Sequence, residues 1–219
     1  FIKNGYFRDS YLKNKFMKKI LLTLSVSCLL AMTASAQVLY SEDFDGIGGP
    51  TAGGAGTYSW PSNMLKRNVD NLTPAATVSY VNEAWERRED FSFNVADSCA
   101  FSTSWYTPAG TANDWMWTPL VAGINAGTTL SWNAVTYDPS YPDGYEVRIM
   151  TSASGPPTGG PGVIGNQITG STQVFTIPAE NTVWTPRTVS LAAFAGQSVY
   201  IGFRNNSTDE FLLLIDDIQ

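Results

Sequence analysis

The stretch SVYIGFRN, residues 198–205, has the pattern that decides the fold class of this chain. Apolar side chains alternate along it with residues of other kinds, and the apolar positions are Val199, Ile201 and Phe203. Because successive side chains of an extended backbone point to opposite faces, these three share one face. The stretch therefore predicts a strand that turns one face toward a core.

Similar short runs recur along the chain between Gly and Pro residues, and helical signal is weak. We expect strands at 38–44, 77–82, 98–105, 128–137, 144–152, 172–177, 184–191, 198–204 and 211–218. The stretch EAWERRED (83–90) predicts one helical turn, and LAAFAGQ (191–197) predicts a short connector. Gly- and Pro-rich loops at 46–56 and 154–162 favour connections that cross between two sheets. The pattern predicts an all-β chain, a jelly-roll β-sandwich of two antiparallel sheets with little helix.

The first 36 residues have the features of a leader rather than of a fold. Lysines after Met17 precede an apolar run and a group of small residues that ends at Ala36, as in a secretory signal peptide. The run is shorter than the ~20 residues that a membrane-spanning helix needs. We interpret 1–16 as upstream sequence included by an imprecise gene prediction, 17–36 as the signal peptide, and 37–219 as one exported domain. The mature chain is expected to be secreted or displayed at the cell surface, without a membrane span.

The exported part is strongly acidic. Residues 1–36 hold six of the 13 basic residues and one of the 19 acidic residues, which leaves seven basic against 18 acidic residues and a net charge of −11. Such a surface repels nucleic acid and favours cations. The chain has no histidine, which excludes Ser-His-Asp and Cys-His catalysis and most catalytic zinc sites. One cysteine, Cys99, remains after the leader, so no disulfide forms within the domain.

Two aspartates, Asp216 and Asp217, directly follow five apolar residues in the stretch DEFLLLIDDIQ, residues 209–219. On a strand they point to opposite faces, so one carboxylate points toward a core. The residues before them are apolar on both faces, which indicates a central or well-covered strand where an unpaired charge is costly. We expect Asp216 to be the carboxylate that turns inward, with Asp217 as the second candidate.

A second acidic group stands at the start of the mature chain, in YSEDFDG (40–46). On a strand Asp43 and Asp45 share one face. If the first and last strands lie side by side, Asp45 approaches Asp216 or Asp217, and carboxylates with nearby backbone carbonyls suit Ca²⁺. The alternative is an exposed acidic edge strand that prevents aggregation.

Aromatic residues gather in STSWYTPAGTANDWMWTPLV, residues 102–121. Trp115 and Trp117 share one strand face, and such a pair either stacks on sugar rings or, more often, packs in a core. Asp114 precedes them, where it either holds a turn or donates an oxygen to a metal ion. These residues are weaker candidates for ligand and metal binding.

Carboxylate catalysis, as in glycoside hydrolysis, is the one enzymatic chemistry that the composition leaves open. The candidate acids are Glu83, Glu86, Glu89 and Asp90. Arg87 and Arg88 lie among them, so a solvated charged turn is the plainer interpretation. The Gly-rich stretches also lack the spacing of a phosphate-binding loop. We therefore predict that the chain is not an enzyme.

Several segments together resemble one family. They are NVDNLTP (68–74), YVNEAWERRED (80–90), STSWYTPAGTANDWMWTP (102–119), TLSWNAVTYDPSYPDGYEVRIMTS (129–152), TVWTPRTVSLAAFAGQSVYIGFRN (182–205) and FLLLIDDI (211–218). Over nearly all of 38–218 the chain resembles the cleaved-adhesin or choice-of-anchor J domain of proteins secreted by Bacteroidetes. The most specific parts are the block SWYTPAGTANDWMWTP and the terminal IDDI.

The resemblance implies a calcium-stabilised jelly-roll sandwich with Asp45, Asp216 and Asp217 as metal ligands. Asp114 matches an acid of the family's DDW element. The family also implies export, often through a type IX secretion sorting domain, and on this comparison the chain ends within its last strand, as a module truncated from a larger protein. We expect a monomeric, non-catalytic module for adhesion or recognition that binds a host or matrix protein or a glycan. The alternative is a carbohydrate-binding module that targets an attached hydrolase to polysaccharide.

Overall fold

The structure is a computed structural model and describes residues 37–46, 59–82, 84–91 and 93–219. The chain divides into two units, Phe1–Gln37 and Val38–Gln219, and every strand described below belongs to the second. In the part of the chain that the structure describes, no helix is long and apolar enough to cross a membrane.

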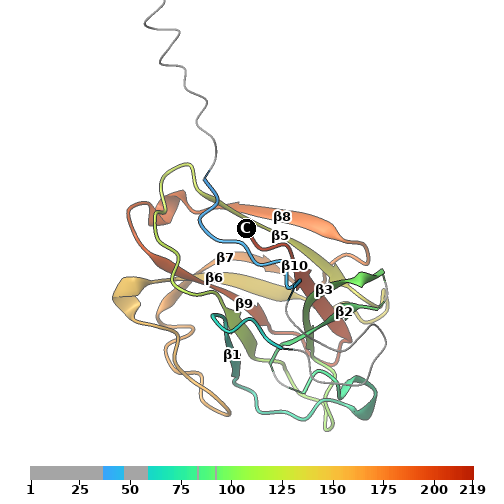
Figure 1. Cartoon of the computed structure of the whole chain (residues 1–219). Helices are drawn as coiled ribbons and strands as arrows, with labels where there is room; N and C mark the ends of the chain where they lie inside the picture. The colour runs from blue at the N-terminus through green and yellow to red at the C-terminus, as the bar shows by residue number, and fades with distance from the viewer. Residues whose placement is uncertain (1–36, 47–58, 83, 92) are drawn as a thin grey trace, which may run out of the picture. The chain divides into compact units, whose positions relative to one another are not determined.

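Ten strands form two antiparallel sheets of five strands each among the described residues (Figure 1). Across sheet I the strands are β1 (Leu65–Asn68), β4 (Asp114–Trp117), β9 (Val199–Asn205), β6 (Tyr145–Thr151) and β7 (Ser171–Ile177). Across sheet II they are β2 (Glu86–Asp90), β3 (Asn94–Thr103), β10 (Leu212–Asp216), β5 (Thr129–Thr136) and β8 (Thr185–Ser190). Three short 3₁₀ helices, η1 (Ala76–Val78), η2 (Ser152–Ser154) and η3 (Ala192–Phe194), lie in the connections. The predicted all-β sandwich of two antiparallel sheets is confirmed.

The main core lies between the two sheets. The alternating residues of β9 enter it as predicted, since Val199, Ile201 and Phe203 are all buried there. Sheet II faces them with side chains such as Trp132 and Leu213. Burying these faces removes apolar surface from water, which is the main force that holds the two sheets together.

Sheet II also carries a second, smaller core on its outer face. In β10, Leu213 and Ile215 belong to the main core, whereas Leu212 and Leu214 belong to the outer one. The segment around η1 covers this outer face with residues such as Val78. The run of apolar residues in β10 therefore reflects a central strand that is covered on both sides, as the sequence indicates.

Several expected elements differ from the structure. The segment 38–44 is not a strand, because it makes one isolated bridge, from Glu42 to Ile218. The segment 77–82 contains part of η1 instead of a strand, and the predicted helical turn at 83–90 is wrong because β2 occupies its described end. The short strand β1 had no signal in the sequence, since its four residues are all half-buried and mostly polar.

Candidate functional site

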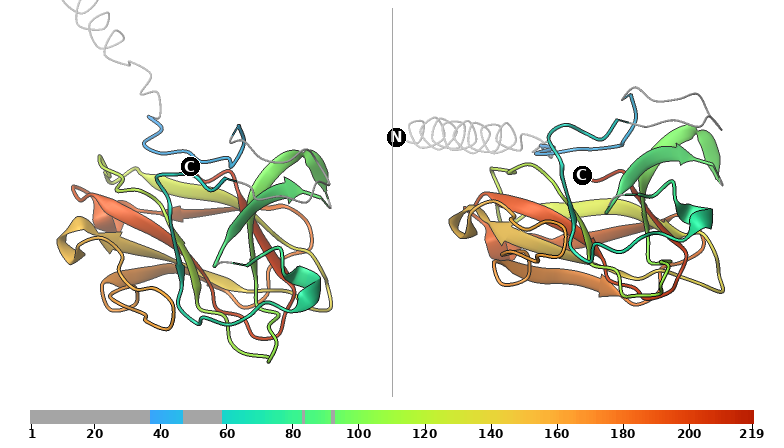
Figure 2. Two further views of the ribbon diagram at one scale, coloured as in Figure 1. Left: turned by 60° about the horizontal axis from the view of Figure 1, so that its bottom comes forward. Right: turned by 90° about the horizontal axis from the view of Figure 1, so that it is seen from below.

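The two ends of the described chain lie side by side, as the metal hypothesis requires. The backbone N–H of Glu42 donates to the carbonyl of Ile218 at 2.9 Å, and the reverse bond has the same length. Gln219 makes a similar pair of bonds with Ser131, at 2.8 and 2.9 Å. Both views of Figure 2 show the first segment, in blue, next to the end marked C. The last residues are thus held between the first segment and β5.

Two left-handed residues stand next to this junction. Phe44 has φ +54° and Asp217 has φ +50°, a conformation that costs free energy for residues other than glycine. Each interrupts the alternation of an extended chain. As a result Phe44 is fully buried, Asp216 is buried with 6% of its surface exposed, and Asp217 is exposed. Regular alternation is thus interrupted at these two positions, although Asp216 is still the buried carboxylate of its pair and Asp217 the exposed one.

Four carboxylates around this junction are near enough for their charges to interact, and we call them the acidic cluster: Asp45, Asp97, Asp216 and Asp217. Burial raises the pKa of Asp216 to about 8, and the charges of the other three add to the rise. Burial, followed by the charge of Asp45, also raises the pKa of Asp97. Cys99 lies fully buried beside the group, and burial raises the pKa of its thiol well above the usual value. Asp97 and Asp216 are therefore the two carboxylates of this acidic cluster whose ionisation is disfavoured.

Asp97 was not among the residues that the sequence pointed to. It lies on β3, which pairs with β10 so that Ala100 stands opposite Ile215. Continuing this register places Cys99 opposite Asp216, and Asp97, two residues earlier on the same face of the sheet, diagonal to it. The strand expected at 98–105 begins one residue after Asp97, and no local pattern shows which residue of another strand lies beside it.

The first segment is attached to sheet II beside the cluster. A carboxylate oxygen of Asp45 accepts the backbone N–H of Ser98 at 3.1 Å. The guanidinium Nε of Arg87 donates to the carbonyl of Phe44, and its Nη2 donates to Ser98 Oγ at 3.3 Å. Burial lowers the pKa of Arg87, while the charges of Asp45 and Glu42 oppose this change. Asp45 is thus held against β3, on the side where Asp97 lies.

The donor set of the cluster fits a hard divalent cation, although the described residues contain no ready-made group of three acidic or cysteine side chains that could hold a metal ion. Ca²⁺ takes six to eight oxygen ligands, and backbone carbonyls and water can supply those that carboxylates do not. Asp216 is a buried carboxylate that would gain from a nearby positive charge, and Asp45 of the first segment is one of the charges that act on it.

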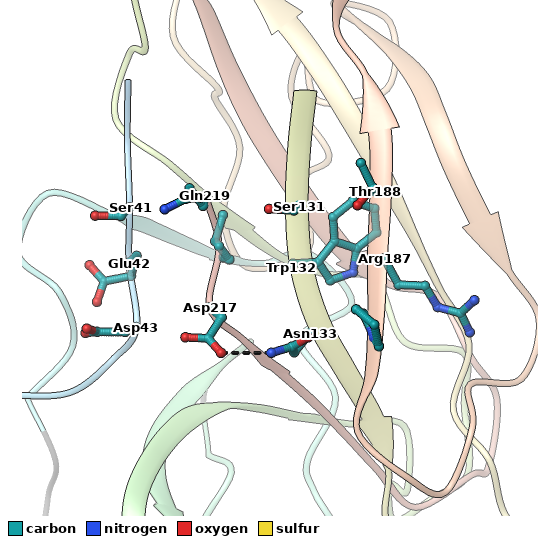
Figure 3. Close-up of a pocket in the computed structure, with 12 residues that line it drawn as sticks. Ser41, Glu42, Asp43, Ser131, Trp132, Asn133, Arg187, Thr188, Asp217 and Gln219 are labelled. Carbon is teal, nitrogen blue, oxygen red and sulfur yellow. Dashed lines mark hydrogen bonds between the residues drawn. The ribbon is translucent and has the colours of Figure 1, made fainter. Parts of the chain in front are cut away.

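A cleft of about 520 Å³ adjoins the junction (Figure 3). Its walls come from the first segment, the last residues, β5 and β8, and include Asp43, Asp217, Asn133 and Arg187. Asn133 Nδ2 donates to Asp217 Oδ2 at 2.8 Å, as the dashed line shows. Arg187 is held by Glu180, whose Oε2 accepts from its Nε at 3.1 Å. Asp43 and Asp217 therefore make the open side of this cleft acidic.

Asp114 lies apart from the acidic cluster. It begins β4 in sheet I, where it is buried and pairs with Asn205 of β9. Tyr106 donates its hydroxyl to Asp114 Oδ2 at 2.7 Å. Burial, followed by the charge of Asp114, raises the pKa of Tyr106. Asp114 thus serves as an internal hydrogen-bond acceptor between sheet I and the segment after β3.

Trp115 and Trp117 stack on each other, with ring centroids 5.4 Å apart and planes 4° apart, but neither is exposed. They lie on the outer face of sheet I, opposite Met116, which is in the main core. The loop before β7 covers them, and Trp117 Nε1 donates to Gln167 Oε1 at 2.8 Å. The guanidinium of Arg204 lies 5.2 Å from the Trp115 ring. The pair packs a small core of its own and offers no open surface for a sugar.

The acidic residues of β2 do not form a solvated turn, so that interpretation is wrong. Glu89 and Asp90 are buried, and Asp90 accepts the indole N–H of Trp184 at 3.1 Å. Glu86 pairs with Lys66 at 3.5 Å. Glu83 lies outside the described residues. The described acids of this segment take part in packing between β1, β2 and the segment before β8.

Comparisons with known proteins agree with the fold. The sequence model of the family described as the Cleaved Adhesin Domain matches residues 83–219. The K1 cleaved adhesin domain of Lys-gingipain from Porphyromonas gingivalis W83 has 19% identity and a TM-score of 0.55, over 83% of this chain and 96% of that one. The K2 domain of Lys-gingipain has 20% identity and a TM-score of 0.56, over 82% and 96%. A search of curated proteins found no match.

Proposed function

Because the chain belongs to the cleaved adhesin domain family, we propose that residues 37–219 form a non-catalytic extracellular module for adhesion or recognition. The family match over 83–219 is the observation that carries this proposal. Two of the acids that the sequence offered for catalysis support it, since Glu86 pairs with Lys66 and Asp90 accepts from Trp184. Such bonds position side chains within the fold rather than toward a substrate.

The proposal includes a structural calcium ion at the junction of the chain ends. Asp216 and Asp45 are the carboxylates that would hold it, with Asp97 and Asp217 close by. The raised pKa of Asp216 supports this role, because a buried carboxylate surrounded by like charges gains more from a cation than an exposed one does. A bound ion would join the first segment to β10 and stabilise the sandwich.

Thermal unfolding tests the ion directly. The melting temperature should be higher in millimolar Ca²⁺ than in EDTA. A ligand present at about 100 times its Kd adds about 2.7 kcal/mol to the free energy of unfolding. Mg²⁺ at equal concentration is the control for unspecific screening, because it prefers a smaller octahedral site. Equal melting temperatures in Ca²⁺ and EDTA would remove calcium from the proposal and leave the adhesion function in place.

Export is the second part of the proposal. We infer that 17–36 directs secretion and that cleavage occurs near Ala36, which the small residues at that point support. The mass of the protein recovered from the medium of a bacterial host tests this inference. A mature chain beginning at Gln37 is the expected result, and retention of an uncleaved chain in the cells contradicts it.

A further inference from the structure

Large apolar side chains gather on one exposed region of the module. Ten such side chains are exposed among the described residues, and six of them belong to this region. The six are Phe91, Phe93, Val95, Tyr137, Tyr141 and Val183, and we call them the aromatic face. Single exposed apolar residues are ordinary, but a gathering of this kind marks a site of interaction.

Ring contacts make the aromatic face continuous. Phe91 lies 5.7 Å from Tyr137 and Tyr137 lies 5.4 Å from Phe211, measured between ring centroids. Phe93 meets Trp184 at 6.2 Å, and Trp184 is bonded to Asp90, the neighbour of Phe91. Segments before β8, after β5 and between β2 and β3 thus contribute to one surface over the outer side of sheet II.

The aromatic face rests on a rigid base. Phe91 stacks on the fully buried Phe101 at 5.3 Å and 24°. Phe101 belongs to the outer core of sheet II, and the half-buried rings of Trp184 and Phe211 pack against the same core. Side chains held in this way lose little freedom when a partner binds, so they are suited to be anchors of an interface.

Charge selects the kind of partner. Every basic side chain of the described domain already contacts a carboxylate, a backbone carbonyl or an aromatic ring. These side chains are Lys66, Arg67, Arg87, Arg88, Arg148, Arg187 and Arg204. Three carboxylates lie beside the aromatic face in the chain, against one guanidinium, that of Arg88 over the Tyr80 ring that meets Phe91: Asp138 follows Tyr137, and Asp209 and Glu210 precede Phe211. The border therefore attracts cations.

We propose that the aromatic face binds a protein partner through apolar side chains that are flanked by lysine or arginine. The inference rests on the proposed recognition function and assigns it a surface and a partner class. A protein fits better than a polysaccharide, because the aliphatic Val95 and Val183 give sugars no flat ring to stack on and one side of Phe91 is already covered by Phe101. Apolar anchors with a complementary charged border are usual in protein interfaces.

A phage-displayed library of random dodecapeptides is the probe, selected on the immobilised full chain. The selected peptides should combine aromatic or aliphatic residues with Lys or Arg. Synthetic copies of the selected peptides should bind the Phe93→Ser and Tyr137→Ser variants at least tenfold more weakly than they bind the unmodified chain. Their binding to the unmodified chain should also weaken at high salt. Leu120→Ser is the matched control, because Leu120 is 45% exposed, close to the 44% of Phe93 and the 38% of Tyr137, and it lies outside the aromatic face.

Three results of the peptide selection would overturn the inference. They are the absence of any enriched peptide, peptides without basic residues, and equal loss of affinity in Leu120→Ser and Phe93→Ser. Binding on a glycan array that disappears in Phe93→Ser also overturns it, since the partner class would then be wrong while the recognition function would stand. Hydrolysis of an array glycan would instead contradict the proposed function itself.

Discussion

The carboxylate of Asp216 accepts a hydrogen bond from the backbone N–H of Asp217 at 2.7 Å, and the left-handed turn at Asp217 leaves the first of these carboxylates buried and the second exposed. Two neighbouring residues of the same type therefore have opposite environments. Asp216 meets the charges of Asp45 and Asp97, whereas Asp217 accepts a hydrogen bond from Asn133 at the edge of the cleft. Substitution should separate their roles.

Asp216→Asn is expected to remove the calcium response and to stabilise the metal-free protein. Asparagine keeps an oxygen for the Asp217 amide and carries no charge to bury. In EDTA at pH 8 its melting temperature should exceed that of the unmodified chain by about 2–4 °C, which corresponds to about 1 kcal/mol for a domain of this size. Calorimetry with EDTA and with Ca²⁺ measures both effects.

Asp217→Asn is the matched control for that change. Its carboxylate is exposed, so its removal should shift the melting temperature in EDTA little and should reduce the calcium response only in part. If Asp217→Asn abolishes the response while Asp216→Asn preserves it, the assignment of the buried ligand is wrong.

A pH dependence should arise from Asp143, which lies well away from the chain ends in the segment before β6. It is fully buried, its Oδ1 accepts from Ser104 Oγ at 2.8 Å and from Asn205 Nδ2 at 3.1 Å, and its Oδ2 has no hydrogen-bond partner among the described residues. Burial raises the pKa of Asp143 to about 7, and the charge of Glu210 adds to the rise. The folded state thus holds this proton more tightly than the unfolded state does.

The sign of the effect follows from that difference. Stability from this group is complete below the unfolded pKa, near 4, and is lost as the pH rises through about 7. The free energy of unfolding should therefore fall from about pH 4 to about pH 7 and level off above that. Asp143→Asn should flatten this fall, because asparagine keeps the Oδ1 acceptor and cannot ionise. The buried amide should also lower the free energy of unfolding at pH 5 by about 1–3 kcal/mol. An unchanged slope in Asp143→Asn urea titrations would assign the dependence to other groups.

The sequence predicted the parts of this molecule that depend on local pattern. The alternation in β9 and the two-sided apolar run of β10 determine which faces are buried, and both follow from the residues alone. It failed for β2, because the run of charged residues in ERRED resembles a solvated turn. Those charges are accommodated by partners distant in the chain, such as Trp184 for Asp90.

The acidic cluster was predictable only in part. Asp45, Asp216 and Asp217 were named from the sequence, but Asp97 joins them through the register of β3 against β10, which no local pattern specifies. The left-handed conformation of Phe44 was also hidden, because a large aromatic residue gives no sign of positive φ. Long-range packing, rather than preference at that position, holds Phe44 in this conformation, since its side chain is fully buried.

Gly202 in β9 should be required for the tryptophan pair. A Cβ at this position would lie 2.6 Å from the ring of Trp117, closer than atoms in folded proteins approach. The ring has little room to move, because it stacks on Trp115 and its indole N–H is bonded to Gln167. Gly202→Ala should therefore lower the free energy of unfolding by about 1–3 kcal/mol, the usual cost of overpacking.

Gly160→Ala supplies the control for this substitution. Gly160 lies in the loop that contains Gln167, and a Cβ there would meet no atom within 4 Å. Its urea midpoint should stay within error of the unmodified chain, whereas that of Gly202→Ala should fall. If both variants unfold at the same denaturant concentration, the Trp117 ring must have an alternative position, and the loop before β7 would then not hold the tryptophan pair in a single arrangement.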